Sequence, residues 1–385
     1  MSTFTQKNSI SLIKNGKPFI EANIHHINSA KKFILLHTYI FRVDEVTGPV
    51  IHALYEAARR GVAIYIIADG YGSMGLPSDF LESLEEAGIY FKYFKPLSPF
   101  NQVGRRMHQK VLLIDNQRCL LGGINLSKEY NLPEEMDPWL DYACALEGEE
   151  VKNVYKRIKK FYLEYFPEKK SQFKLYNKIN PRPAIETCLI KTNVNDWTRY
   201  KTEIFKSYLS AIRGAKESIY LLAPYFIPSR KLLFELKKAR RRGVEVHLIL
   251  GQNSDHKIVQ KVEQYFFKWY IMNDLKIYEW PKSIVHGKLA LIDQRWVTIG
   301  SYNHNYISKF GNIEINLEVI NRNFSEIVSQ EFQSILQQSH KMNRSDFESR
   351  YTFLNRLYMY SSFTVLSFIS FISIFLIFRR ASKSR

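Results

Sequence analysis

Two copies of one eight-residue pattern, His-x-Lys-x-x-x-x-Asp, carry the side chains that a reaction at a phosphodiester needs. The copies consist of His108, Lys110 and Asp115, and of His286, Lys288 and Asp293. Such a reaction requires a nucleophile, an acid for the leaving oxygen and positive charge around the phosphate oxygens. Two histidines and two lysines supply all three without a metal ion. We therefore expect one active site that both copies share.

The residues around each copy predict how its side chains are arranged. Side chains alternate along an extended strand, so a His and a Lys two residues apart point the same way. The apolar run after each Lys predicts a buried strand that ends in a turn at the Asp. Small residues follow in both copies and allow the backbone to approach a phosphate. We expect the phosphate to be bound by Asn125 and Asn303, with Gly123 and Ser301 beside them.

Each histidine is also followed, at a similar distance, by a carboxylate. Asp141 lies after His108, and Glu318 lies after His286. A carboxylate that accepts a hydrogen bond from one imidazole nitrogen fixes the tautomer and leaves the other nitrogen free to react. We therefore expect Asp141 and Glu318 to orient the histidines.

The elements that position these residues repeat along the chain. An Arg-Arg-Gly-Val segment at 59–62 and again at 241–244 ends a helical pattern, with basic residues and a glycine where a helix C-terminus favours them. Alternating helices and strands predict an α/β fold, with a mostly parallel or mixed sheet flanked by helices in each half. We expect lobes at 1–165 and 185–340, joined by a linker at 166–184.

At these motifs the sequence resembles the phospholipase D superfamily over nearly all of residues 1–340. The resemblance implies two lobes related by a pseudo-twofold axis, with both motifs at their interface. It implies a two-step reaction through a phosphohistidine, without metal or cofactor. In that scheme His108 attacks, His286 acts as acid and then base, and Asp115 and Asp293 support the motif turns. The symmetry of the sequence does not itself decide which histidine attacks.

Other segments resemble the bacterial cardiolipin synthases within that superfamily: Asp69-x-x-Gly72-Ser73, Trp139-x-Asp141, Pro224 to Pro228, and Ser254-Asp255. This resemblance implies transfer of a phosphatidyl group between two phosphatidylglycerol molecules, with release of glycerol. Asn305 and Ile307 depart from the Asp and Arg usual in that subgroup, which bears on the choice of acceptor. A hydrolytic phospholipase D, a nuclease of the same superfamily and a non-catalytic membrane scaffold remain alternatives.

The composition and charge of the chain narrow the classes of molecule that it could bind. The chain has 385 residues, 45% of them hydrophobic, and a net charge of +18. Such a charge favours anionic partners, which include phospholipid, a membrane surface and nucleic acid. We expect anionic phospholipid, and the hydrophobic C-terminal segment makes nucleic acid the less favoured partner. The sequence has no nucleotide-binding glycine loop or metal-ligand cluster, so no cofactor is expected. One shared site requires no oligomer.

The C-terminal segment 357–378 runs for 22 residues without a charge, a length that suits a membrane-spanning helix. A juxtamembrane segment at 341–356 would precede it, and a basic tail at 379–385 would follow it. The first residues contain no apolar signal segment. We expect a protein of the bacterial inner membrane, with its catalytic body on the cytoplasmic side.

Overall fold

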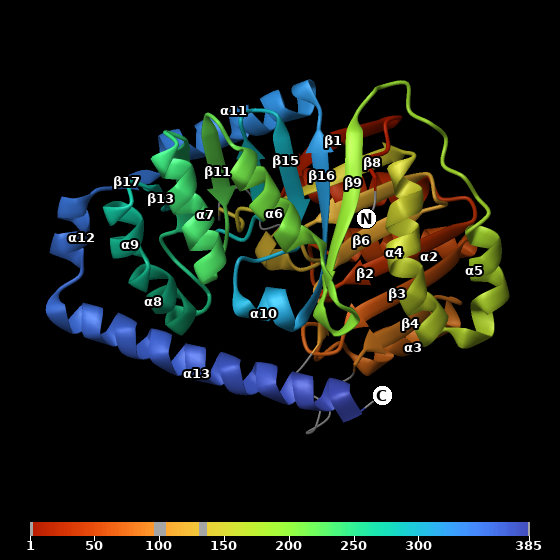
Figure 1. The fold of residues 1–385 in the computed structure, drawn as a ribbon. Helices are drawn as coiled ribbons and strands as arrows, with labels where there is room; N and C mark the ends of the chain where they lie inside the picture. Colours follow the sequence, from red (N-terminus) through yellow and green to blue (C-terminus); the bar gives the residue numbers. More distant parts are fainter. Residues whose placement is uncertain (1–2, 96–104, 131–136, 384–385) are drawn as a thin grey trace.

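The computed structural model describes residues 3–95, 105–130 and 137–383, with side chains described as far as residue 368. Two α/β lobes lie side by side, each built on one mixed sheet (Figure 1). The first sheet has the strand order β1 (Asn8–Lys14), β8 (Tyr142–Gly148), β7 (Arg118–Gly122), β6 (Lys110–Ile114), β2 (Phe33–Thr38), β3 (Ala63–Asp69) and β4 (Tyr90–Phe94).

The second sheet has the strand order β10 (Lys201–Thr202), β9 (Leu189–Asp196), β16 (Asn312–Ile320), β15 (Trp296–Gly300), β14 (Leu289–Ile292), β11 (Ser218–Leu222), β12 (Glu245–Gly251), β13 (Lys276–Trp280) and β17 (His340–Met342). Its run from β16 to β13 repeats the run from β8 to β4, so the predicted duplication is confirmed. Among the neighbouring strands of these two strand orders, β2–β3–β4 and β11–β12–β13 pair in parallel and the others pair antiparallel. Each motif strand returns in an antiparallel hairpin, which makes the sheets mixed rather than mostly parallel.

Helices cover both sheets and fill the space between them. The outer helices are α1 (Lys17–Asn28), α2 (Gly48–Arg59) and α3 (Ser78–Glu86) in the first lobe, and α6 (Glu203–Gly214), α7 (Arg230–Arg241), α8 (Lys257–Tyr265) and α9 (Phe267–Met272) in the second. Residues of α4 (Glu150–Tyr165) and α11 (Arg322–Gln338) join both sheets in one central core. Gly61 and Gly243 follow α2 and α7 with positive φ angles of 82° and 89°, as the shared Arg-Arg-Gly-Val segment predicts.

The segments outside the two repeats pack against them. The expected linker contains α5 (Lys170–Tyr176), whose Phe173 is buried in the central core. After residue 340, β17 pairs with β13, and Phe347 of α12 (Arg344–Arg350) is buried in the core of the second lobe. Much of the segment expected to be juxtamembrane therefore completes the second lobe.

The expected membrane-spanning helix is not confirmed. Over the part of the chain that the structure describes, no helix is both long and apolar enough to cross a bilayer. The segment lies in α13 (Phe353–Lys383), which runs beneath α8 and α10 (Tyr306–Phe310) in Figure 1. One face of its first half packs on α8, where Phe363 stacks on Tyr265 at 4.6 Å and Met359 is buried. The side chains from residue 369 onward fall outside the described part.

Candidate active site

Each motif histidine is fixed by the main chain of the opposite lobe. The short strand β5 (Arg106–Met107) pairs with β16 of the second lobe, and the amide of His108 donates to the carbonyl of Ile313 at 3.0 Å. In the reverse direction, the amide of His286 donates to the carbonyl of Leu140 of the first lobe at 2.8 Å. These exchanged contacts bring the two motifs to one interface, as the sequence predicts.

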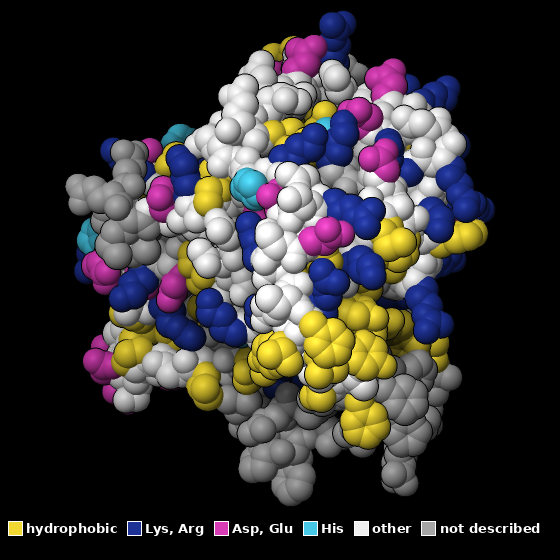
Figure 2. Space-filling model, turned by 90° about the vertical axis from the view of Figure 1, so that its left-hand side faces the viewer, with side chains coloured by type: hydrophobic (Ala, Val, Ile, Leu, Met, Phe, Trp, Pro, Cys, Tyr) yellow, Lys and Arg dark blue, Asp and Glu magenta, His cyan; other side chains and the backbone are white. Residues whose placement is uncertain are grey.

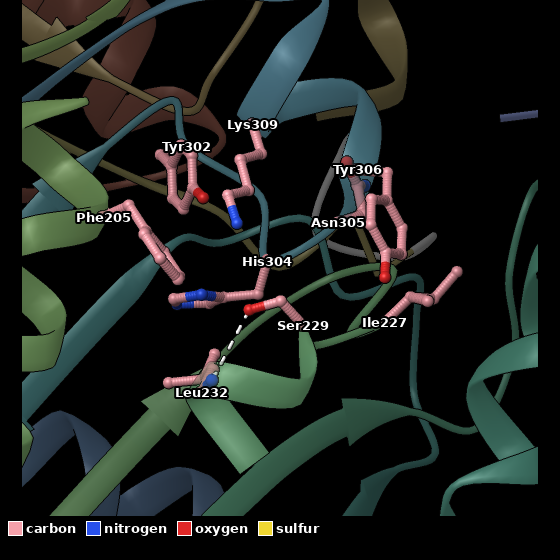
Figure 3. Close-up of a pocket in the computed structure, with 9 residues that line it drawn as sticks. All are labelled: Phe205, Ile227, Ser229, Leu232, Tyr302, His304, Asn305, Tyr306 and Lys309. Atoms are coloured by element: carbon pink, nitrogen blue, oxygen red, sulfur yellow. Dashed lines mark hydrogen bonds between the residues drawn. The ribbon is translucent and has the colours of Figure 1, made fainter. Parts of the chain in front are cut away.

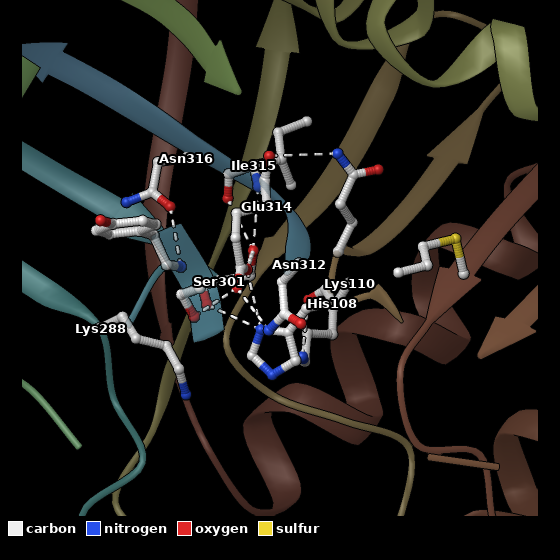
Figure 4. Close-up of polar contacts among 12 residues, drawn as sticks. His108, Lys110, Lys288, Ser301, Asn312, Glu314, Ile315 and Asn316 are labelled. Carbon is white, nitrogen blue, oxygen red and sulfur yellow. Dashed lines mark hydrogen bonds and ion pairs between the residues drawn. The ribbon is translucent and has the colours of Figure 1, made fainter. Parts of the chain in front are cut away.

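The ring of His108 is oriented by two oxygen atoms of the second lobe (Figure 4). Its Nδ1 lies 2.9 Å from Oε2 of Glu314 and 3.0 Å from the carbonyl oxygen of Ser301. Since both partners are acceptors, Nδ1 carries the hydrogen and Nε2 keeps a lone pair. The hydroxyl of Ser301 donates to the same Glu314 oxygen at 2.5 Å, which holds the carboxylate in place.

The ring of His286 is oriented by the first lobe. Its Nδ1 lies 2.6 Å from Oδ2 of Asp141, while Oδ1 of Asp141 accepts the amide of Tyr142 at 2.7 Å. Its Nε2 lies 3.3 Å from the hydroxyl oxygen of Tyr130. Nζ of Lys288 lies beside the same ring, 3.2 Å from Nε2 and 2.7 Å from Nδ1. The ring of Trp139 packs near both, 5.8 Å from His286 and 5.1 Å from Tyr130 between ring centroids. Asp141 therefore has the expected orienting position, toward the histidine of the opposite lobe.

The expectation for Glu318 was wrong, because Glu314 takes that position. Glu318 is turned away and accepts hydrogen bonds from Trp296, Asn193, Ser207 and Lys191. The amide of Ser301 bonds the carbonyl of Ile315, just as the amide of Gly123 bonds that of Tyr142. Glu314 is therefore the counterpart of Asp141 in sheet register. Counting residues from the histidine misses it, because the loop before β16 is shorter than the loop before β8.

Two of the four predicted phosphate-binding residues instead make room for the carboxylates or hold them. A Cβ atom on Gly123 would lie 2.3 Å from Oδ1 of Asp141, so only glycine lets that carboxylate approach. At the equivalent position, the side chain of Ser301 bonds Glu314. The small residues in this segment thus allow the carboxylate side chains to lie close to the backbone.

The two asparagines differ from each other. Asn125 accepts the amide of Ile40 at 3.1 Å and donates to the hydroxyl of Tyr130 at 2.7 Å. Asn303 is 6% exposed, and its Oδ1 has no hydrogen-bond partner among the described residues. A role in binding phosphate stays a prediction for both residues, and Asn303 is the one with an uncommitted polar atom.

The two lysines are buried and influence each other. Nζ of Lys110 donates to the carbonyl of His108 at 2.8 Å, and Nζ of Lys288 donates to the carbonyl of His286. Burial lowers the pKa of Lys110 well below its ordinary value, and the charge of Lys288 lowers it further. Burial lowers the pKa of Lys288 to about 8. Nζ of Lys288 lies 4.0 Å from Oδ2 of Asp141. A phosphate bound between the two lysines would favour the charged form of both.

The titrating groups at the two histidines also differ. Burial lowers the pKa of both His108 and His286 below the ordinary 6.5, and Lys288 contributes at His286. Burial raises the pKa of Asp141 to about 7. Burial also opposes the charge on Glu314, but His108 and Lys110 outweigh it and hold that pKa below its usual range. Both rings are therefore neutral near pH 7, and Glu314 keeps its charge.

The aspartates that end the motifs support their turns, in agreement with the resemblance. Asp115 accepts the amides of three successive residues, 31–33, at 2.7–2.9 Å. Asp293 accepts the amides of residues 216–218 at 2.8–3.0 Å. Both have left-handed φ angles, of 52° and 51°. Each carboxylate ties the end of its motif strand to the start of the neighbouring strand.

Residues of the cardiolipin synthase resemblance lie around the histidines. Asp69 accepts the amide of Met107 at 2.8 Å and so holds the residue before His108. The hydroxyl of Tyr225 donates to Asp255 at 2.7 Å, with its ring centroid 6.4 Å from that of His286. These segments therefore shape the site from both lobes.

The residues after Asn303 border a small cavity, which Figure 3 shows. Asn305 accepts the amide of Ser308 and caps α10, whereas Ile307 is 60% exposed. His304 lines the cavity, packed 4.4 Å from the ring of Tyr208. Of the two departures from the subgroup pattern, Asn305 keeps a capping function that Asp would also serve, and Ile307 faces solvent.

Sequence reasoning missed Glu314 and Tyr130. Strand register would have identified Glu314, whereas nothing in the sequence signals that Tyr130 reaches the histidine of the other lobe. Within the described ranges, no group of three His, Cys, Asp or Glu side chains is placed to hold a metal ion.

Comparisons with known proteins agree with this geometry. Residues 23–157 and 208–336 match the family described as cardiolipin synthase, PLD-like domain. Cardiolipin synthase B of Salmonella typhi is 32% identical over 86% of this chain and 80% of its own length. The cardiolipin synthase of Clostridium perfringens strain SM101 is 29% identical over 91% and 75%.

A similar fold occurs in solved structures. Phosphatidylserine synthase of Haemophilus influenzae matches over 97% of both chains, with a TM-score of 0.76 and 13% identity. At that identity the likeness shows the fold alone. The family match covers most of both lobes and includes both His-Lys pairs and both orienting carboxylates. The chain therefore belongs to the phospholipase D-like domain family of the cardiolipin synthases.

Proposed function

We propose that this protein is a phosphatidyltransferase that moves a phosphatidyl group from one phosphatidylglycerol to a hydroxyl of a second and releases glycerol. The observation that carries the proposal is the shared site, in which each lobe contributes a buried His-Lys pair and orients the histidine of the other. Relatives named cardiolipin synthase, similar over most of the chain, support a phospholipid as the substrate.

In the first half-reaction His108 attacks the phosphorus through Nε2, since Glu314 and Ser301 hold its Nδ1. A nitrogen–phosphorus bond forms, and the bond from phosphorus to the oxygen of the headgroup glycerol breaks. His286 gives that oxygen a proton from Nε2. The negative charge of the bound phosphodiester favours the protonated form of His286 that this step requires.

In the second half-reaction a hydroxyl of another phosphatidylglycerol attacks the phosphorus. Neutral His286 takes its proton at Nε2, the nitrogen–phosphorus bond breaks, and His108 regains its lone pair. Lys110 and Lys288 turn from backbone carbonyls to the phosphate oxygens, where their charge stabilises the transition state. In this cycle His108 forms and releases the bond to phosphorus, and His286 gives and takes the proton.

The partner surface we propose is a bilayer that contains anionic phospholipid. The exposed stripe of α13 carries Leu354, Leu357, Tyr358, Val365 and Phe368, opposite the face that packs on α8. Figure 2 shows hydrophobic side chains gathered at the lower edge of the molecule, with lysines and arginines above them. An apolar stripe beside basic residues fits the boundary between acyl chains and anionic headgroups.

The product profile tests this function. Purified protein is incubated with mixed vesicles of phosphatidylglycerol and phosphatidylethanolamine, and products are resolved by mass spectrometry. We expect cardiolipin and free glycerol in equal amounts. Phosphatidic acid alone would instead identify a hydrolase. If folded protein changed no lipid, the transferase proposal would fail.

A further inference from the structure

A chain of hydrogen bonds within the first lobe reaches the reactive nitrogen of the second motif. The hydroxyl of Tyr130 lies 2.7 Å from Nδ2 of Asn125 and 3.3 Å from Nε2 of His286. Tyr130 is 1% exposed, and its ring packs against Trp139. The mechanism above assigns no task to this buried hydroxyl.

The donors and acceptors of the chain fix its direction. The amide nitrogen of Asn125 can only donate, so it uses a lone pair of the Tyr130 oxygen. Nδ1 of His286 gives its hydrogen to Asp141, which leaves Nε2 as an acceptor, and Nζ of Lys288 lies 3.2 Å from the same Nε2 as a second donor. The hydroxyl hydrogen of Tyr130 therefore points to Nε2 of His286. Asn125, predicted to hold phosphate, holds this tyrosine.

The other histidine differs. Among the described residues, the structure gives no hydrogen bond to Nε2 of His108, whose nearest aromatic partner, Tyr39, packs edge-on at 4.9 Å between ring centroids. The nitrogen assigned to attack is thus uncommitted, and the nitrogen assigned to proton transfer is occupied.

We propose that Tyr130 is a positioning residue, which holds Nε2 of His286 in the free enzyme and yields it to the leaving oxygen when substrate binds. This rests on the proposed function, because it assigns His286 the proton transfer. The exchange keeps the ring aimed at the site and prevents His286 from competing with His108 as the nucleophile.

The surroundings of His286 define what the loss of Tyr130 would change. Burial, Lys288, Lys110 and His108 lower the pKa of His286, and Asp255 opposes them. Tyr130 itself faces Asp141, Asp255 and Glu129, and with burial they raise its pKa well above the ordinary value, so it stays a donor. A hydrogen bond donated to the neutral imidazole also lowers the pKa of His286. Removing that hydrogen bond should raise it.

The direct test is Tyr130→Phe, followed by 15N NMR of the histidine rings, with His286 assigned from His286→Ala. We expect the Nε2 resonance of neutral His286 to move toward that of an unbonded nitrogen. Its titration midpoint should rise by about half to one pH unit. The matched control is Tyr162→Phe, which removes a buried hydroxyl of the same lobe that has no partner among the described residues. An unchanged Nε2 resonance and midpoint in folded Tyr130→Phe would overturn the proposal.

Kinetics provide the second readout. In Tyr130→Phe we expect kcat to fall by about tenfold, because the ring of His286 loses a hydrogen bond that orients it. KM should not rise, because the hydroxyl that competes with the substrate for Nε2 is lost as well. A raised KM with unchanged kcat would contradict the proposal. The NMR result needs no lipid turnover, so failure of the proposed function would leave that result standing.

Discussion

The two halves of the active site carry the same motif in different surroundings. His108 is held through Nδ1 by Glu314 and a backbone carbonyl, and its Nε2 is uncommitted. His286 is held through Nδ1 by Asp141, and its Nε2 contacts Tyr130 and Nζ of Lys288. The two motifs are equivalent in sequence, and the residues that differ between the lobes support the separate tasks that we propose for the two histidines.

The carboxylates extend this contrast. Glu314 is held charged by His108, Lys110 and the hydroxyl of Ser301. Asp141 has no equivalent hydroxyl, and burial raises its pKa to about 7. A charged carboxylate would stabilise positive charge as it develops on His108, the ring that we propose attacks. A carboxylate that titrates near neutrality suits His286, the ring that we propose gains and loses a proton.

Removing each histidine in turn should produce the largest effects. We expect His108→Ala and His286→Ala each to lower net transfer by on the order of 10³-fold or more. A phosphatidyl ester of p-nitrophenol needs no acid to leave, so with this substrate His286→Ala should keep a burst of nitrophenol. His108→Ala should show no burst. The reverse pattern in stopped-flow absorbance would exchange the two roles.

A single methyl group at Gly123 should disturb only the Asp141 side. In Gly123→Ala the new Cβ would meet the carboxylate of Asp141 at 2.3 Å and displace it from His286. We expect kcat to fall by roughly 10²-fold, because misplacement by about an ångström has that cost. Gly48→Ala, where a Cβ meets nothing within 4 Å, is the control. If both variants were equally active in the vesicle assay, the activity would not depend on the close approach of the Asp141 carboxylate to the backbone at Gly123.

The pH profile should show the effect of Glu314 on the titration of His108. Burial lowers the pKa of His108 below 6.5, so the nucleophile is neutral above that lowered pKa, and the acid limb of kcat/KM should lie below pH 6.5. The charge of Glu314 raises the pKa of His108, so Glu314→Gln should move this limb to still lower pH while reducing kcat. An acid limb above pH 6.5, or a shift to higher pH in the variant, would contradict the assignment.

The motif-ending aspartates should affect stability more than chemistry. Asp115→Asn replaces a carboxylate that accepts three backbone amides and should lower the free energy of unfolding by about 1–3 kcal/mol. Asp293→Asn should cost less, since its site is more exposed. Glu82→Gln, on the exposed face of α3, is the control for urea unfolding. If Asp115→Asn lowered the free energy of unfolding no more than the control does, a structural role for Asp115 would be contradicted.

The sequence predicted what lies within a repeat better than what crosses between repeats. The motif strands and the repeated succession of helices and strands follow from local spacing, whereas the supporting role of Asp115 and Asp293 was implied by the family resemblance. Glu318 was chosen by residue count, but the register of β15 and β16 places Glu314 at the histidine. Tyr130 was missed because its partner His286 is distant in sequence.

The C-terminal segment shows a different limit. Uncharged length at 357–378 suggested a spanning helix, yet the described part of α13 uses Met359 and Phe363 to pack on the second lobe. Hydropathy reports how apolar a segment is, and it does not report which apolar side chains the protein covers itself.

The most direct measurement is the location of the covalent intermediate. Wild-type protein is mixed with phosphatidylglycerol, quenched within one turnover and digested under conditions that preserve phosphohistidine, and the peptides are sequenced by mass spectrometry. The account predicts a phosphatidyl group on His108 and none on His286. A group on His286, or turnover to product without any adduct, would contradict the division of tasks between the two halves.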